Sequence, residues 1–369
     1  MNPVYWISDC ATTPLASSSE ENYALVKQGK SSVAVCPSLA TSDKPFYASL
    51  FSENSFSSEN DLTSFESLCL HSLQTAIAKS EIDFSSAKTI FILSTTKGNI
   101  ELINAPDERL NLHAAANRIL AKTKIAADIL VISNACVSGV SALITAQRLL
   151  ANGNYDTAII CGADRITSFV ASGFQSLYAT ADSVCKPYDA SRNGINLGEA
   201  AATVILSSKK QSDILVGNGS VSNDANHISG PSRTGVELAQ AVQNTLSKNE
   251  VHAEELAFIS AHGTATVYND EMESKAFSHA GLSAIPLQSL KPHFGHTLGA
   301  AGVLESAISV HALREGVVLP SLNYEQSGVS GTIFVNQKLL FTTKKYALKT
   351  ASGFGGVNAS ILFSKNNLS

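Results

Sequence analysis

Long apolar runs and targeting signals are absent from this sequence of 369 residues. No uninterrupted apolar run approaches the roughly 18 residues that a membrane-spanning helix needs, so we expect no membrane span. The N-terminus, MNPVYWISDC, contains no basic segment followed by an apolar stretch, so we expect no signal peptide. The hydrophobic content of 44% is ample for a large core, and together these features favour a cytoplasmic enzyme.

Charged residues are also scarce, at 15% of the chain, and the net charge is −5. The negative balance argues against nucleic-acid binding. A low charge density indicates that much of the surface is buried, and a subunit interface is one place to bury it.

None of the six cysteines has CxxC spacing. Five of them are therefore expected to be reduced and mostly buried thiols: Cys10, Cys36, Cys69, Cys161 and Cys185. His293 and His296 are close enough in sequence to suggest a metal site. Since no matching ligand pair lies nearby, we expect no metal.

The sixth cysteine, Cys136, follows the apolar run DILVI (128–132) and precedes the helix-like stretch VSALITAQRLLANG (140–153). This pattern predicts a buried strand that turns into a helix. At such a junction, unpaired backbone N–H groups and the helix dipole favour a thiolate. The alternative interpretation of a lone cysteine is a small buried residue that fills space.

Two histidines occupy similar positions further along the chain. The run LAFIS (256–260) predicts a strand that leads to His262, and Lys291 and His296 lie on a loop that leads into another predicted helix. One histidine alone is usually structural. A cysteine and two histidines that each follow a strand resemble a catalytic site, because residues distant in sequence can meet in the fold.

The chain also repeats itself. The segment SNACVSGVSALITAQRLLANG (133–153) resembles SLKPHFGHTLGAAGVLESAISVHALREG (289–316), since both combine a strand end, a turn and a long helix. The segment GEAAATVILSSK (198–209) likewise resembles GFGGVNASILFSK (353–365). These pairs indicate a duplicated α/β fold.

We expect an N-terminal half at residues 1–210 and a C-terminal half at residues 211–369. In such a fold, equivalent strand ends of both halves can converge on one crevice. Cys136 would come from the first half and His296 from the matching position in the second.

Five motifs occur in a characteristic order: ACVSG (135–139), PYDASRNGINLGEAA (187–201), AHGTATVYNDEME (261–273), LKPHFGHTLGAAGVLE (290–305) and GFGGVN (353–358). With them, almost the whole chain resembles a β-ketoacyl-(acyl carrier protein) synthase of the elongating type. The resemblance implies the thiolase fold, an α/β fold with a duplicated, five-layered α-β-α-β-α architecture. The two histidines separate the chain from initiating synthases, which combine their cysteine with one histidine and an asparagine.

The residue types suit this chemistry. A thiolate holds an acyl group far better than an alcohol near neutral pH, and Cys136 is the candidate. Loss of CO2 from a malonyl unit leaves an enolate, whose oxygen His262 and His296 could face with Nε2–H, if an acceptor fixes the other ring nitrogen. The resemblance implies an oxyanion hole from the backbone N–H groups of Cys136 and Phe354.

Other residues are expected to support the site. Lys291 would stabilise developing negative charge, and Asp270 and Glu273, on one helix face, could hold it in an ion-paired network. A cap and a surface charge are the alternatives for these two acids, and Asn269 with Asp270 would cap the helix. Glu305 is expected to be structural.

Four residues are expected to bind the substrate arm or shape the site beside it: Thr264, Thr266, Gly353 and Gly355. A plain turn role is the alternative for the threonines. Phe354 could swing as a gate between its two flanking glycines, or be an ordinary core residue. Family members often carry phenylalanine where this chain has Ser352, so the pocket wall differs there.

The resemblance also implies partners. Substrates would be carried on the phosphopantetheine of an acyl carrier protein, with no other cofactor, and the active dimer would contain a second copy or a chain-length-factor-like homologue. Four lysines are candidates for docking an acidic carrier, with plain solvated surface as the favoured alternative for each: Lys122, Lys124, Lys209 and Lys210. The Ser-rich segment 41–66 is expected to be a loop with a short helix over the entrance or the partner subunit.

Three interpretations of the function compete. The leading one is a condensing enzyme of fatty-acid, polyketide or polyene synthesis. The second is a noncatalytic chain-length-factor-like subunit, although such subunits usually lack the cysteine. The third is an unrelated Cys/His hydrolase. The segment GTATVYNDEME (263–273) is similar to the corresponding segment of synthases of aryl-polyene or flexirubin pigments.

Overall fold

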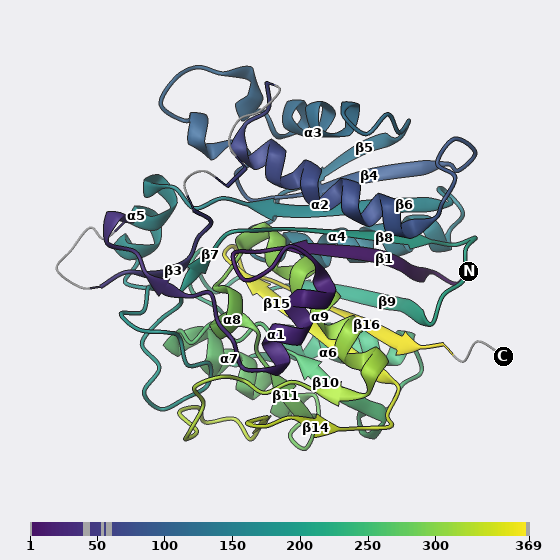
Figure 1. Cartoon of the computed structure of the whole chain (residues 1–369). Coiled ribbons are helices and arrows are strands. Elements are labelled where there is room, and N and C mark those ends of the chain that lie inside the picture. Colours follow the sequence, from purple (N-terminus) through teal and green to yellow (C-terminus); the bar gives the residue numbers. More distant parts are fainter. Residues whose placement is uncertain (1, 40–44, 53–54, 57–60, 367–369) are drawn as a thin grey trace.

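The computed structural model describes residues 2–39, 45–52, 55–56 and 61–366 (Figure 1). The order strand, helix, strand, helix, strand, helix, strand, strand occurs twice along it. The first pass consists of β1 (Tyr5–Thr12), α2 (Ser64–Ser80), β4 (Thr89–Ser94), α3 (Leu112–Ala121), β5 (Asp128–Ile132), α4 (Ser138–Ala151), β6 (Thr157–Asp164) and β8 (Ala200–Ser207). The second consists of β9 (Ile214–Asn223), α6 (Val236–Lys248), β10 (Leu256–Ser260), α7 (Val267–His279), β11 (Pro286–Gln288), α9 (Ala301–Glu315), β15 (Tyr346–Gly353) and β16 (Val357–Lys365).

Further elements lie within these two passes. They are α1 (Ser19–Lys27), β2 (Ala34–Val35), β3 (Tyr47–Ser49), α5 (Ser168–Ser176), β7 (Leu197–Gly198), α8 (Lys291–Phe294), β12 (Val317–Val318), β13 (Phe334–Val335) and β14 (Leu340–Phe341). The expected boundary between the halves, at residue 210, falls in the loop between β8 and β9.

Eleven of the described strands form a continuous sheet in the order β13-β11-β10-β15-β16-β9-β1-β8-β6-β4-β5. Reading outward from the central pair, β1 and β9 are each followed by an antiparallel neighbour. Beyond this neighbour, three strands run parallel to one another on the β1 side and four on the β9 side. The two sides meet through a single pair, Tyr5 with Leu215. Parallel strands of this kind are buried on both faces, and the apolar runs of β4 and β6 have the composition that such burial requires.

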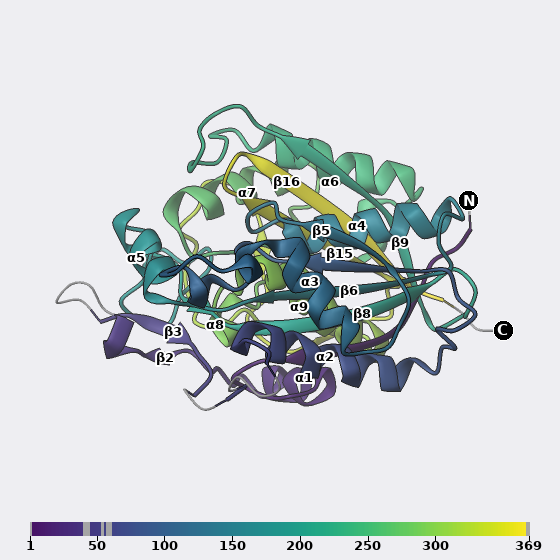
Figure 2. The same ribbon diagram turned by 90° about the horizontal axis from the view of Figure 1, so that it is seen from above.

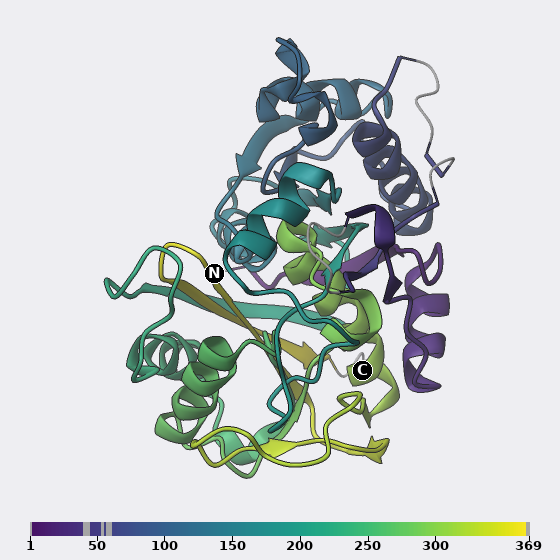
Figure 3. The same cartoon turned by 90° about the vertical axis from the view of Figure 1, so that its left-hand side faces the viewer.

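Helices cover the sheet in layers. Helices α4 and α9 contact strands on both sides of the central pair, so they form the middle layer. Helices α2 and α3 cover the outer face of the first side, and α6 and α7 that of the second (Figures 2 and 3). The structure therefore has the five-layered α-β-α-β-α architecture that the sequence predicted.

The two middle helices touch at a pair of glycines. A Cβ on Gly302 would lie 2.4 Å from the backbone nitrogen of Val140, and one on Gly139 would lie 2.8 Å from the Cα of Gly302. Only residues without side chains allow this approach. If the two helices are aligned at these glycines, Cys136 matches Gly299. His296 lies three residues earlier, so the expectation that it occupies the matching position was wrong.

Strand β5 is not buried as the sequence predicted. It is the last strand on its side of the sheet, and its residues from Ile129 to Ile132 are only half-buried. An apolar run predicts a buried strand because composition carries no information on which strand lies at an edge.

Two other local predictions need correction. Helix α7 begins at Val267, so Asn269 and Asp270 lie in its first turn and do not cap it. Of the segment 41–66, residues 41–44, 53–54 and 57–60 lie outside the described residues, and the remainder contains β3 and the start of α2. Among the described residues, no helix is long and apolar enough to span a membrane.

Candidate active site

Cys136 lies in the turn between β5 and α4, as the sequence predicted. The preceding residue, Ala135, has a φ of +45°, a left-handed conformation that is strained for a residue with a side chain. The turn is held by the side chain of Ser138, which donates to the carbonyl of Ala135 and accepts from the N–H of Asn134. Strain that surrounding hydrogen bonds hold in place is typical of functional turns.

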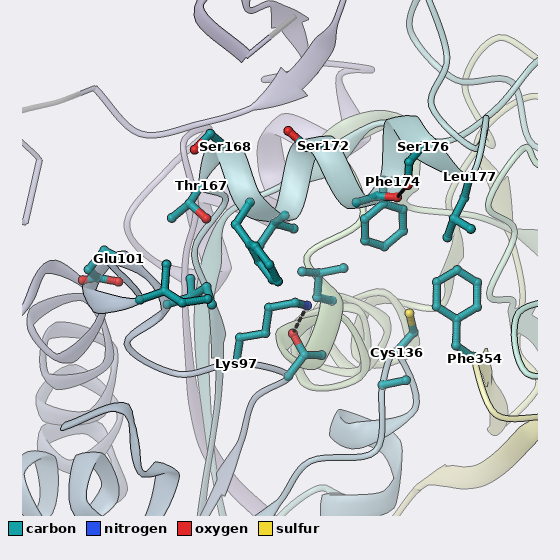
Figure 4. A pocket seen from close by; sticks show the side chains of 18 of the residues that line it. Lys97, Glu101, Cys136, Thr167, Ser168, Ser172, Phe174, Ser176, Leu177 and Phe354 are labelled. Atoms are coloured by element: carbon teal, nitrogen blue, oxygen red, sulfur yellow. Dashed lines mark hydrogen bonds between the residues drawn. The ribbon is translucent and has the colours of Figure 1, made fainter. Parts of the chain in front are cut away.

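Two cavities meet at Cys136. One has a volume of about 1040 Å³ and the other about 420 Å³, and both are lined by Cys136, Phe174 and Phe354. Figure 4 shows the larger cavity, with Cys136 and Phe354 together and Glu101 at a distance from them. The histidines His262 and His296 line only the smaller cavity. The sulfur of Cys136 therefore lies where a cavity that contains no catalytic histidine meets a cavity that both histidines line.

The Cys136 thiol is more basic than the sequence suggested. Burial raises its pKa to about 11, although the positive charges of Lys291 and Lys97 act in the opposite direction. The expected preference for a resting thiolate was therefore wrong, because removing the side chain from water outweighs the favourable charges around it.

The two histidines face one another as neutral rings. Their centroids are 5.3 Å apart, the ring planes are nearly perpendicular at 86°, and both side chains are buried. Burial, followed by the nearby charge of Lys291, lowers the pKa of both rings well below the ordinary value. Each ring consequently carries one N–H at neutral pH.

We expected a hydrogen-bond acceptor to fix one nitrogen of each ring, but His296 has no such acceptor in the described part of the chain. Neither of its ring nitrogens has a hydrogen-bond partner among the residues that the structure describes. Buried polar groups are normally paired, so the unpaired His296 side chain in the wall of the smaller cavity is a candidate contact for a ligand there.

Lys291 belongs to a different ion-pair network from the expected one. Its Nζ lies 2.5 Å from Oε1 of Glu305, and the Nζ of Lys349 lies 2.5 Å from Oε2 of the same carboxylate. All three side chains are buried. Burial acts to raise the pKa of Glu305, but the two ammonium groups outweigh it and lower the pKa. The cluster carries one excess positive charge beside the histidines.

Asp270 and Glu273 instead hold the turn after β10. Their carboxylates accept from four consecutive backbone N–H groups, from His262 to Ala265, at 2.7 to 3.2 Å. Glu273 also accepts from the hydroxyl of Tyr188 at 2.6 Å. Burial, which exceeds the effect of these donors, raises the pKa of Asp270 to about 7. With their acceptor positions occupied, these acids fix the position of His262 and are not available to Lys291.

The remaining expected residues lie at the same site. The hydroxyls of Thr264 and Thr266 are 2.8 Å apart and line the smaller cavity. A Cβ on Gly353 would lie 3.2 Å from the backbone nitrogen of Cys136, so this glycine lets the loop approach the nucleophile turn. Gly355, at a φ of +88°, turns the chain beyond Phe354 in a conformation that favours glycine.

Phe354 separates the cavities and is 39% exposed. Its ring stacks on Phe174 with centroids 5.9 Å apart. Ser352 is buried and donates to the side chain of Asn358 at 2.7 Å. The partial exposure of the Phe354 ring is compatible with movement, whereas an ordinary core residue would be enclosed.

Sequence reasoning missed two organising residues. Lys349 is the single charged residue of strand β15, and a lone lysine within a strand was the available signal. The carboxylate of Asp164, at the end of β6, accepts from the N–H of Gly299 at 2.7 Å and from the N–H and hydroxyl of Thr96 at 3.0 to 3.1 Å. It thereby links the loop after β4 to the segment that follows His296.

The four candidate docking lysines are misplaced for a carrier at this site. Lys122 and Lys124 precede β5, and Lys209 pairs with Asp156 just before β6. Lys210 bonds to the carbonyl of Ser80. Strands β5, β4 and β6 are parallel, and Cys136 follows the carboxyl end of β5. The lysines therefore lie at the end of the sheet opposite to Cys136.

The six cysteines are free, and all but Cys36, which is half-buried, are buried. Within the described part of the chain, no three His, Cys, Asp or Glu side chains are grouped so that they could hold a metal ion.

Family comparison agrees with this arrangement. The beta-ketoacyl synthase N-terminal domain family matches residues 1–212, and the beta-ketoacyl synthase C-terminal domain family matches residues 214–325. The chain belongs to the β-ketoacyl synthase family.

Among curated relatives, the 3-oxoacyl-[acyl-carrier-protein] synthase 2 of Rhizobium meliloti is 30% identical over 277 residues, which are 70% of this chain and 65% of the relative. The synthase of the same name from Vibrio cholerae is 29% identical over 255 residues, 63% of this chain and 61% of the relative. A putative polyketide beta-ketoacyl synthase 1 of Streptomyces halstedii is 30% identical over 250 residues, 63% and 59% respectively. The matched regions thus span less than two thirds of these relatives.

Solved structures share the whole fold. A beta-ketoacyl synthase from Burkholderia phymatum superimposes with a TM-score of 0.90 at 22% identity, covering 100% of both chains. A chain of the complex between the ketosynthase ApeO and its chain length factor ApeC, from Xenorhabdus doucetiae, gives 0.86 at 22% identity, covering 99% of this chain and 98% of that one. This likeness confirms the predicted fold class.

Proposed function

We propose that this β-ketoacyl synthase condenses an acyl group held on Cys136 with a malonyl unit on an acyl carrier protein, with loss of CO2. The observation that carries the proposal is the position of Cys136 between two cavities, with both neutral histidines in the smaller one. The larger cavity would hold the acyl chain. The smaller one would admit the phosphopantetheine arm.

In the first step, the sulfur of Cys136 forms a thioester with the acyl group, and the carrier's thiol leaves with the proton that Cys136 gives up. The pKa of about 11 means that the thiol is protonated at neutral pH, so the proton must move during the attack. The backbone N–H groups of Cys136 and Phe354 would hold the acyl oxygen, and the close approach at Gly353 supports this pairing. One such donor is typically worth about 3 kcal/mol.

In the second step, the bond between the malonyl carbon and its carboxylate breaks and CO2 leaves. The electron pair of the broken bond forms an enolate, whose oxygen accepts hydrogen bonds from the N–H groups of His262 and His296. Neutral rings can donate in this way, and the unpaired nitrogens of His296 are available for it. The enolate carbon then attacks the acyl carbonyl, the C–S bond to Cys136 breaks, and the lengthened chain stays on the carrier.

Neighbouring residues would assist. The excess positive charge of Lys291, Glu305 and Lys349 favours the developing enolate. The hydroxyls of Thr264 and Thr266 would bond the phosphopantetheine arm. The scheme calls for no metal or redox cofactor, and we expect it to operate in the cytoplasm.

The mouth of the smaller cavity offers a docking surface for the carrier. Four exposed apolar residues surround it: Leu177, Tyr178, Val267 and Tyr268. An apolar rim suits a carrier whose helices present hydrophobic side chains, and it replaces the misplaced lysines as the candidate contact.

A heterodimer is the second arrangement to consider, because the chain is structurally similar to a chain of a complex in which the ketosynthase ApeO is paired with its chain length factor ApeC. In that assembly this chain would be the ketosynthase, since it has Cys136, His262 and His296. A purely noncatalytic role would leave these three residues without a function. A polyketide or polyene pathway, including the aryl-polyene and flexirubin type, is compatible with either arrangement.

Intact-protein mass spectrometry tests the proposal. Wild type incubated with acyl-carrier thioesters should gain one acyl group, which malonyl-carrier then removes with release of CO2. Cys136→Ala should gain none, and His296→Asn should keep its acyl group when malonyl-carrier is added. Release of free acid without malonyl-carrier would point to a hydrolase, and no adduct with any carrier would point to a noncatalytic subunit.

A further inference from the structure

A buried lysine contacts two of the elements that support the histidines. Lys349 lies in β15, where it pairs in register with Ser260 of the parallel strand β10. Its side chain is fully buried, and its Nζ donates to the carbonyls of Ser260 and Ala261 at 3.3 and 3.4 Å. The same Nζ donates to Oε2 of Glu305, on α9, at 2.5 Å. Lys349 therefore joins the end of the strand that leads to His262 to helix α9.

The contacts of Lys349 require its charged form. An ammonium carries three N–H groups and a neutral amine only two, so three acceptors call for the ammonium. Burial lowers the pKa of Lys349, whereas the carboxylate of Glu305 acts in the opposite direction. A buried charge is costly unless it is paired and hydrogen-bonded, and here each N–H has an acceptor. Loss of this ammonium would break all three contacts between β15 and its neighbours at once.

The other side of the His262 backbone is held by Glu273. Oε1 of this acid accepts from the N–H of His262 at 2.7 Å and from the hydroxyl of Thr350 at 2.9 Å. Lys349 and Thr350 are neighbours in β15. One short stretch of this strand therefore contacts both the carbonyls that precede His262 and the acid that binds its N–H.

Resting on the proposed function, we propose that Lys349 is a positioning residue that holds His262 in place for the loss of CO2 and has no part in the loading of Cys136. In that scheme His262 acts only on the enolate, whereas loading depends on the turn at Cys136 and the N–H of Phe354. Misplacement of a reacting group by about 1 Å can slow a reaction by about a hundredfold. Loss of Lys349 should therefore slow one step and spare the other.

The charge of Lys349 is felt at the same place as its hydrogen bonds. Burial is the largest cause of the lowered pKa of both histidines, and the positive charge of Lys349 adds to it. Burial is also the largest cause of the raised pKa of Cys136, but the lysine charges that act on this thiol are those of Lys291 and Lys97. The electrostatic effect of Lys349 thus falls on the groups of the second step.

A purely structural role is the alternative for Lys349. Lys349→Met leaves the pair between Lys291 and Glu305 complete, so the carboxylate keeps a counter-ion and we expect the variant to fold. A general loss of folded enzyme would lower the rates of both steps by the same factor. The ratio of the two rates in one preparation therefore separates a positioning role from a structural one.

Intact-protein mass spectrometry on rapidly quenched samples measures both rates. One is the transfer of an acyl group from its carrier to Cys136, and the other is its removal when malonyl-carrier is added to acylated enzyme. Lys349→Met should slow removal by about tenfold to a hundredfold and leave transfer close to wild type. At saturating malonyl-carrier the maximal rate should fall while the half-saturating concentration stays unchanged. Lys344→Met, at an exposed position, is the control and should match wild type in both steps.

Equal slowing of both steps, or removal as fast as in wild type, would overturn the inference while leaving the condensing reaction intact. Should Lys349→Met fail to fold, Lys349→Gln repeats the comparison with two N–H groups and no charge, and the same ratio decides.

Histidine NMR tests the position of His262 without the chemistry. In protein labelled with ¹³C-histidine, Lys349→Met should shift the imidazole signals of His262 and leave those of His113, exposed on α3, unchanged. Unchanged signals of His262 would overturn the inference. If these signals shift but no carrier acylates Cys136 in wild type, the proposed function fails and the contact of Lys349 with the His262 segment stands.

Discussion

At the residue scale, the charge balance beside the histidines depends on Glu305. Its carboxylate is the common partner of two buried ammonium groups, those of Lys291 and Lys349. Buried ion pairs add little stability compared with apolar packing, but removal of one partner leaves an uncompensated charge. The cluster is therefore sensitive to loss of its single acid.

We expect Glu305→Gln to lower the free energy of unfolding by about 3–5 kcal/mol, since two buried ammonium groups would lose their counter-ion. Urea unfolding measures this loss. Glu325→Gln, at an exposed position, is the control and should change stability little. A loss for Glu305→Gln as small as that of the control would contradict the ion-pair assignment.

A second prediction at the residue scale concerns the thiol of Cys136. Its pKa is raised from 9.0 to about 11, so the reactive thiolate is a minor species at neutral pH and grows as pH rises. The rate of iodoacetamide alkylation at Cys136, followed by peptide mass spectrometry, should rise by about tenfold per pH unit from neutral pH to pH 10. A plateau below pH 9 would mean that the thiolate is stabilised, as the sequence alone suggested.

At the scale of elements, the contact between α4 and α9 sets the geometry of the site, because these helices follow Cys136 and His296. Their contact at Gly139 and Gly302 leaves no room for a side chain. Gly173, in helix α5, has open space where a Cβ would lie. The chain thus offers two helical glycines in opposite surroundings.

Gly302→Ala should lower the free energy of unfolding by about 1–3 kcal/mol, because the new Cβ would collide with the backbone of Val140. Gly173→Ala should instead raise it by about 0.5–1 kcal/mol, since alanine favours helix and meets no atoms there. Chemical denaturation of both variants and of wild type measures these changes in the free energy of unfolding. Equal effects of the two substitutions would show that the helices can separate without loss.

Elements near the site were predictable where the signal is local. The turn at Cys136 follows from an apolar run, small residues and a helical period, all within a few residues of one another. The partners of Lys291 were not predictable, since Glu305 and Lys349 reach it from different elements, whereas spacing on one helix favoured Asp270 and Glu273. The exposure of β5 depends on strand order, which no single segment encodes.

At the scale of the whole molecule, an uncovered sheet edge and an exposed apolar cavity opening indicate a partner subunit. Strand β5 ends the sheet with a half-buried apolar run, and such an edge is a template for pairing with another strand. The larger cavity opens beside Ile103 and Phe169, which are exposed. A second subunit on this side would extend the sheet and could cover both apolar residues.

We therefore expect light scattering after size-exclusion chromatography to give about twice the chain mass of 38.8 kDa. Val131→Lys, in β5, should shift the mass toward that of one chain, because a lysine on an edge strand opposes pairing with another strand. Val221→Lys, at an exposed position of β9, should leave the mass unchanged. If the wild-type chain alone is monomeric but doubles its mass with a chain-length-factor-like homologue, β5 serves a heterodimer, and Val131→Lys should abolish that pairing instead. A wild-type dimer that survives Val131→Lys would place the interface elsewhere.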